Sequence, residues 1–328
     1  MNTETNTIRP RNCHLPDWQT LKLILSSFIV FNFYLNSLCN IKHEYSILTE
    51  ILNHGLIPMF IFIAAYTGKG ISWHNWYDNL VPAVIIYITF QTVAAVILYS
   101  DNQLTIREYL LFPQNGVWFF LAVPVWQSVF LSLPSFMKYK INTVLVIFLS
   151  SIVISFLSIR YLADKTGFYS VIKYFPFFVM AYFFDDEKVL KIRKKPLITI
   201  ITTTITTATC IYLLTTKEPT LIMKINTTSL CYGFSIYLLS LFLSISISVT
   251  IICISLSTNR FIKSANNALG VYLIHPIICF YFLTLLNGLK IDTGLPLLIL
   301  LTLLTIILTL LIAKNSIIHW FLSPEIKR

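Results

Sequence analysis

The chain has 328 residues, of which 56% are hydrophobic and only 12% are charged, and its formal net charge is +10. A soluble domain carries about a quarter charged residues, so this composition excludes a soluble globular protein and indicates an integral membrane protein. The apolar runs are longer than the roughly ten residues of a barrel strand and lack its alternation, which predicts an all-α bundle of membrane helices. The positive charge does not indicate nucleic-acid binding, because basic residues of membrane proteins collect in cytoplasmic loops.

We expect about ten membrane spans, each an apolar run long enough to cross a bilayer. A polar N-terminal tail at residues 1–19 precedes them, and no signal-peptide cleavage pattern follows it, so the first span is expected to stay as an anchor. The loops are short, which favours one transmembrane domain over residues 20–315, followed by a C-terminal tail at 316–328. The expected spans are 21–38, 47–66, 80–99, 116–135, 141–160, 169–184, 197–216, 229–256, 268–287 and 295–314.

The distribution of basic residues predicts the orientation of these spans. Ten spans place both termini on one side, and that side then holds most of the 24 lysines and arginines, including the cluster at 188–195. Because cytoplasmic loops of membrane proteins are enriched in Lys and Arg, both tails are expected in the cytoplasm. The sequence therefore predicts a multi-pass protein of the cytoplasmic membrane, surrounded by membrane lipids.

One ionisable residue, His275, lies near the start of the long apolar run from Ala268 to Leu286. Ionisable groups inside membrane spans are rare and face a protein interior or a wet cavity, so each is a functional candidate. The next residue, Pro276, has no N–H, so the carbonyl of Tyr272, four residues back, must find another hydrogen-bond partner. Two interpretations stay open: a packed core histidine beside a helix kink, or a catalytic group.

Motifs for metal or phosphate binding are not evident in the sequence. None of the six cysteines has metal-ligand spacing, and the chain has no Gly-rich phosphate loop, no HExxH and no GxSxG. We therefore expect no metal cofactor, and the membrane composition leaves no reason to expect a nucleic-acid partner.

Five short motifs occur at the second, third, fourth, sixth and ninth expected spans. They are Ile57-Pro58-Met59-Phe60, Leu80-Val81-Pro82, Gly116-Val117-Trp118-Phe119-Phe120, Phe175-Pro176-Phe177-Phe178 and Leu269-Gly270-Val271-Tyr272-Leu273-Ile274-His275. In this order the motifs resemble those of the acyltransferase-3 family of bacterial ten-span membrane proteins, in particular its branch related to fucose 4-O-acetylases. The resemblance covers most of the chain.

This resemblance implies a membrane-bound O-acyltransferase. The reaction would transfer an acyl group, usually acetyl from acetyl-CoA as co-substrate, to a sugar hydroxyl of a cell-envelope glycan or a lipid-linked sugar. Such a reaction needs a general base for the hydroxyl proton, or an imidazole that carries the acyl group. It also needs positive charge to hold the phosphates of the coenzyme.

The candidate catalytic residues depart in part from the family pattern. The family's first span carries a basic residue and, ten positions later, a histidine thought to be catalytic; here these positions hold Lys22 and Asn32. An asparagine amide can donate and accept hydrogen bonds but cannot act as a base near neutral pH. The remaining candidates are His275, which matches a family position, and His54 at the outer mouth of the second span. A second interpretation of His54 is a solvated loop histidine.

The candidate substrate-binding residues also differ from the pattern. The family's arginine-rich stretch before the third span corresponds to residues 73–79, which contain no Arg or Lys, so Lys69 is the nearest fixed cation. Trp118 either anchors the chain at the outer interface or stacks on a sugar ring. Lys173, in an apolar span, either snorkels to the outer face or meets an anion. The candidate substrate-binding residues are Lys22, Tyr66, Lys69, Trp118 and Lys173.

Two functional hypotheses follow from these residues. The first is the acyltransferase, with a cavity between the spans that opens to the cytoplasm. The second is a catalytically inactive relative that acts in glycan transport, flipping or assembly, because broken helices with lone polar groups also suit that role. The first hypothesis predicts that the cavity is lined by Lys22, Asn32, Tyr66, Trp118 and His275.

Overall fold

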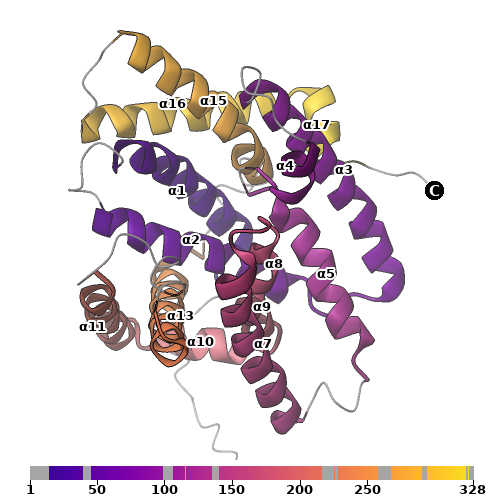
Figure 1. Ribbon diagram of the computed structural model, residues 1–328, viewed down its shortest axis with the longest axis vertical. Coiled ribbons are helices and arrows are strands. Elements are labelled where there is room, and N and C mark those ends of the chain that lie inside the picture. The colour runs from indigo at the N-terminus through magenta and orange to yellow at the C-terminus, as the bar shows by residue number, and fades with distance from the viewer. Residues whose placement is uncertain are drawn as a thin grey trace, which may run out of the picture.

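The computed structural model describes a chain whose regular structure is helical throughout the described part (Figure 1). Six of its helices are long and apolar enough to cross a membrane, so the chain is a multi-pass helical membrane protein. The described residues are 15–39, 46–98, 106–114, 116–134, 140–215, 225, 228–257, 267–289, 294–322 and 324.

Each expected span overlaps a helix or a pair of helices, but α4, α10 and α17 lie outside the expected spans, and α3 begins at Trp73 rather than at the expected residue 80. Expected spans 21–38, 47–66 and 80–99 correspond to α1, α2 and α3, and the other seven each meet a helix or a pair of helices. The six helices long and apolar enough to cross a membrane are α2, α3, α7, α13, α15 and α16. The bounds are α1 Trp18–Cys39, α2 Ser46–Thr67, α3 Trp73–Leu98, α4 Ile106–Leu111, α5 Trp118–Ser132, α7 Ile141–Leu162, α8 Tyr169–Lys173, α9 Phe175–Tyr182, α10 Asp186–Lys194, α11 Pro196–Thr215, α13 Leu230–Ile254, α15 Ala268–Leu289, α16 Leu295–Ala313 and α17 Ser316–Leu322.

Helices α1 and α2 form the centre of the bundle. α1 packs against α2, α15 and α16, whereas α2 packs against α13, α9 and α5, so the two helices join the two halves visible in Figure 1. Their facing residues are almost fully excluded from the surface: Leu25, Met59 and Phe62 are at most 2% exposed. Hydrophobic packing does not by itself hold helices together in lipid, so close van der Waals contact and interhelical hydrogen bonds take over. One example is Ser26 Oγ, which donates to the carbonyl of Ala268 on α15 at 3.2 Å.

The start of α5 differs from the expected span at 116–135. The backbone between α4 and α5 is irregular, and α5 begins only at Trp118. Buried Gln91 on α3 holds this segment. Its amide nitrogen Nε2 donates to the carbonyls of Tyr109 and Phe112 at 2.9 and 3.2 Å, and its Oε1 accepts a hydrogen bond from the N–H of Gln114 at 2.8 Å. Irregular backbone among membrane helices requires such partners, because lipid offers none.

The expected span at 169–184 is not one continuous helix. α8 ends at Lys173 and α9 begins at Phe175, since Pro176 lacks the N–H that would continue the ladder. Side chains from neighbouring helices donate hydrogen bonds to carbonyls at the end of α8. Ser155 Oγ donates to Lys173 O at 2.6 Å, and Trp126 Nε1 donates to Val171 O at 2.9 Å. The break places Tyr174 and Lys173 inside the bundle, near the start of α5.

The substitution Gln91→Leu tests the role of this amide. It removes three hydrogen bonds while keeping a side chain of similar size, so we expect the free energy of unfolding to fall by about 1–3 kcal/mol. The measurement is thermal or denaturant unfolding of the purified protein in detergent. Val96→Leu, on the exposed face of the same helix, is the matched control and should change stability little; equal stability of the two variants would contradict the role.

Candidate functional site

A cavity of about 220 Å³ lies between α1, α2, α5 and α15. Its walls are mostly apolar, and Lys22 is the one charged side chain among the residues that line it. Concave, largely apolar sites with a few polar groups are the usual form of small-molecule sites. The lining residues are Gln19, Lys22 and Ile29 of α1, Ile57, Phe60 and Ala64 of α2, Trp118, Phe119 and Phe120 of α5, and Ala268, Leu269 and Tyr272 of α15.

Lys22 brings an unpaired cation to this cavity. It lies in the second turn of α1 and is half-buried, and among the described residues it makes neither a salt bridge nor a hydrogen bond. A buried or half-buried ammonium without a counter-ion favours the entry of an anion. The expected position of Lys22 in the cavity wall therefore agrees with the structure.

Aromatic rings form part of the cavity wall. Trp118 is only 8% exposed and stacks on Tyr174, with 5.5 Å between ring centroids and 7° between planes. Tyr272 packs against Phe60 and Phe120, and its hydroxyl donates to the carbonyl of Gly116 at 3.1 Å. Because Trp118 is buried among other rings, it does not lie on the lipid-facing surface as an interfacial anchor would.

His275 is buried, and its hydrogen bonds fix its tautomer. Its Nδ1 lies 2.8 Å from the carbonyl oxygen of Tyr272 and 3.1 Å from that of Val271. A carbonyl can only accept, so Nδ1 carries the proton and, in the neutral ring, Nε2 keeps the lone pair. The expectation that Pro276 forces Tyr272 O to find another partner is confirmed, and that partner is the imidazole itself. The His275 side chain is only 3% exposed.

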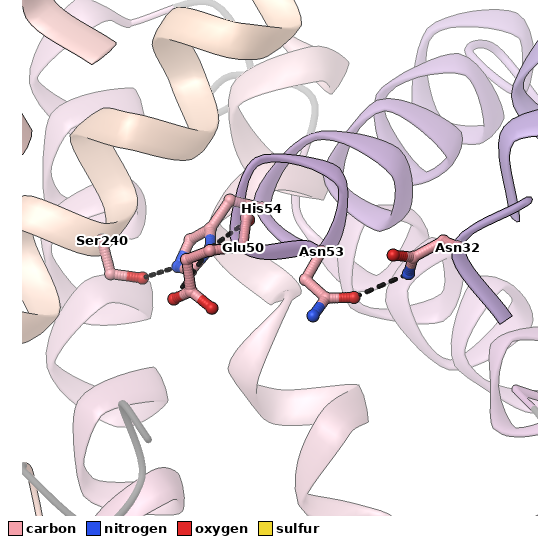
Figure 2. A network of polar contacts seen from close by, with 5 residues as sticks. All are labelled: Asn32, Glu50, Asn53, His54 and Ser240. Carbon is pink, nitrogen blue, oxygen red and sulfur yellow. Dashed lines mark hydrogen bonds and ion pairs between the residues drawn. The ribbon is translucent and has the colours of Figure 1, made fainter. Parts of the chain in front are cut away.

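Asn32 is paired with a second amide. Its Nδ2 donates to Asn53 Oδ1 at 2.8 Å, as Figure 2 shows, while its own Oδ1 is buried and has no hydrogen-bond partner. Asn53 precedes His54 in the sequence, but its side chain points toward Asn32 whereas that of His54 points toward Ser240 (Figure 2). Among the described residues no histidine is hydrogen-bonded to Asn32, so this amide has an open acceptor rather than a base beside it.

The side chains of Asn32, Asn53 and His275 lie at the same end of the cavity. Asn32 follows the lining residue Ile29 by three positions, and His275 follows Tyr272 by three, each about one helical turn further along. α1 and α15 run in the same direction, because Ser26 contacts Ala268 and Phe33 contacts His275, with 5.8 Å between ring centroids.

On α2, which runs the other way, Asn53 precedes the lining residue Ile57 by four positions. We call Asn32, Asn53 and His275 the polar layer. It lies one turn beyond the end of the cavity that is opposite to Lys22.

Tyr66 and Lys69 do not line the cavity. The Tyr66 hydroxyl donates to Asp186 at the start of α10, and Lys69 Nζ donates to the carbonyl of Phe184 while lying 4.4 Å from the centre of the Tyr66 ring. Lys69 follows the end of α2, and burial lowers its pKa, although Asp185 and Asp186 act in the opposite direction. These two candidate binding residues therefore tie the end of α2 to the segment that leads into α10.

His54 and Lys173 form a separate polar group. The side chain of His54 is 10% exposed and lies between α2 and α13, so it is not the solvated loop histidine of the second interpretation. Lys173 Nζ lies 4.8 Å from the centre of the Tyr174 ring and 6.0 Å from that of Tyr169. Neither residue lines the cavity, although Tyr174 stacks on its wall residue Trp118.

Comparison with models of known protein families, with curated proteins and with solved structures finds no match. Among the described residues, no group of three or more His, Cys, Asp or Glu side chains could hold a metal ion.

A pair of substitutions tests the link between His275 and Pro276. His275→Leu leaves the carbonyl of Tyr272 without a donor, so we expect a loss of about 1–3 kcal/mol in the free energy of unfolding. Adding Pro276→Ala restores a backbone N–H for the same carbonyl and should recover part of that loss. Unfolding in detergent measures both effects, and absence of recovery in the double variant would contradict this account of the hydrogen bond.

Proposed function

We propose that the chain is a membrane-bound O-acyltransferase that transfers an acyl group, usually acetyl from acetyl-CoA, to a sugar hydroxyl of a cell-envelope glycan or a lipid-linked sugar. One observation carries the proposal: a cavity with an unpaired cation at one end has, one turn beyond its other end, an imidazole whose Nε2 lone pair is held free. The order of sequence motifs that resemble the acyltransferase-3 family supports the same reaction class.

The proposal includes an orientation in the cytoplasmic membrane. With ten spans and both termini in the cytoplasm, the start of α1 and therefore Lys22 face the cytoplasm, where acyl-CoA is made. The polar layer then faces the outer side, where envelope glycans lie. The cavity is too small to enclose a whole coenzyme, so its apolar walls would hold the acyl thioester end, with the phosphates outside near Lys22.

Each residue has a role in the proposed reaction. His275 Nε2 removes the proton of the sugar hydroxyl, and the sugar oxygen attacks the thioester carbonyl; the C–S bond breaks, and the proton passes from His275 to the thiolate. Asn32 Oδ1, buried and without a partner, accepts a hydrogen bond from the sugar. Lys22 attracts the phosphates, and the rings of Trp118 and Tyr272 exclude water from the thioester.

A second candidate function is a catalytically inactive relative that acts in glycan transport, flipping or assembly. The observation in its favour is Asn32 itself, because an amide paired with Asn53 stands where the resembled family has a histidine. The broken segment at Tyr174 and the polar layer would also serve a path for a sugar.

The first experiment measures the O-acetyl content of surface glycans by mass spectrometry. His275→Gln keeps a polar side chain but removes the base, so we expect acetylation to fall at least about a hundredfold, close to the gene deletion. His319→Gln, an exposed histidine on α17, is the matched control and should leave acetylation unchanged. Acetylation that is unchanged in the deletion, alongside a reduced amount of exported glycan, would support the second candidate instead.

Lys22→Gln tests the donor end of the cavity. Removal of a charge-assisted contact worth about 1.5–3 kcal/mol should raise KM for acetyl-CoA at least about tenfold while changing kcat much less. The assay is acetyl transfer by the purified protein in lipid nanodiscs. Lys314→Gln, an exposed lysine after α16, is the control; an unchanged KM in Lys22→Gln would contradict the assigned role.

A further inference from the structure

A second polar group, on the face of α2 that meets α13, joins Glu50, His54 and Ser240 (Figure 2). Glu50 and His54 are one turn apart on α2, and Ser240 lies in the middle of α13. The Ser240 hydroxyl lies 2.9 Å from His54 Nε2. Two turns further along α13 the two helices are also close, because a Cβ added to Gly55 would lie 2.5 Å from Cγ2 of Ile247.

The direction of each hydrogen bond in this group is fixed. His54 Nδ1 lies 3.0 Å from the backbone carbonyl of Glu50, which can only accept, so Nδ1 carries the proton. In the neutral ring Nε2 is then the acceptor, and Ser240 donates its hydroxyl proton to it. The Glu50 carboxylate lies 3.5 Å from Nδ1 and stabilises the imidazolium that forms when Nε2 takes the proton. A serine, a histidine and a carboxylate are thus aligned in the order that activates a serine as nucleophile.

Ser240 differs from most other hydroxyls in the described helices. Ser235, Ser248 and Thr302 each donate to the backbone carbonyl four residues earlier in their own helix. This is the usual hydrogen bond of a hydroxyl side chain in a membrane helix. Ser240 instead donates to a ring nitrogen of another helix. Placing a histidine and a carboxylate among apolar spans is costly, which makes their joint use in chemistry a better explanation than packing alone.

We propose that Ser240 is a nucleophile, activated by His54 and Glu50, that takes up an acyl group from an acyl thioester. Ser240 Oγ bonds to the acyl carbon while the C–S bond of the donor breaks; the serine proton passes to His54 Nε2 and from there to the leaving thiolate. A hydroxyl-bearing acceptor then attacks the acyl carbon and gives its proton to Nε2; the bond between the acyl carbon and Ser240 Oγ breaks, and the proton passes from Nε2 to Ser240 Oγ. Lys173 Nζ, which lies over the rings of Tyr174 and Tyr169, is the nearby cation whose charge acts on His54 and Glu50.

The identity of the donor rests on the proposed function, whereas the reactivity of Ser240 does not. The test is therefore labelling of the purified protein in nanodiscs with a fluorophosphonate, followed by peptide mass spectrometry. We expect an adduct on Ser240 that is lost in Ser240→Ala and slowed at least about a hundredfold in His54→Gln. Ser244→Ala, a buried serine one turn further on the same helix, is the control and should leave labelling unchanged.

A gain of reactivity gives a second, independent measurement. In Ser240→Cys the thiol lies beside His54 Nε2 and should be alkylated by N-ethylmaleimide about tenfold faster than the thiol of Ser244→Cys. Adding His54→Gln should remove the difference. Equal rates for the two cysteines, or absence of a fluorophosphonate adduct on Ser240, would overturn the proposal.

The two proposals can fail separately. If the cavity is the transferase site and Ser240 is inert, His275→Gln abolishes acetylation while Ser240 takes no label. If Ser240 is reactive and the cavity proposal is wrong, Ser240 takes the label while His275→Gln leaves acetylation unchanged.

Discussion

The backbone's need for hydrogen bonds in an apolar surrounding governs the functional regions of this molecule. At Pro276, before α5 and at Tyr174, a side chain from the same or a neighbouring helix pairs with a carbonyl or amide that the helix leaves without a partner. Pro276 leaves the carbonyl of Tyr272 without its backbone donor, and His275 Nδ1 donates a hydrogen bond to that carbonyl. Gln91 holds the irregular segment before α5, and Ser155 holds the end of α8. The candidate site lies among these breaks because they are the places where polar groups are tolerated.

The fold could be predicted from the sequence to the extent that lipid dictates it. Long apolar runs have no alternative to the helix in a membrane, so the six long spans and most boundaries followed from composition alone. The late start of α5 at Trp118 and the break at Tyr174 could not be predicted with the same certainty. Both depend on partners distant in the sequence, Gln91 and Ser155, which decide whether irregular backbone is tolerated.

The sequence indicated which residues could belong to the candidate site, but not which residues they would contact. Lys22 and Trp118 line one cavity as expected, and His275 lies beyond its end, because each sits in an apolar run where its chemistry stands out. Asn53, Glu50 and Ser240 were not identified as candidates from the sequence. Whether a residue faces a cavity or a neighbouring helix depends on the rotation of each helix, which the periodicity of uniformly apolar spans does not fix. The Glu50–His54 spacing of four residues was the one visible hint.

Tyr272 has two contacts that together make the cavity a rigid one. Its ring is part of the cavity wall, and its hydroxyl holds the carbonyl of Gly116, whose φ of +82° suits glycine and whose position leaves no room for a side chain. The turn before α5 and the wall formed by α15 are thereby fastened together. A molecule that enters the cavity therefore meets a wall whose position depends on one hydrogen bond and on the absence of a side chain at residue 116.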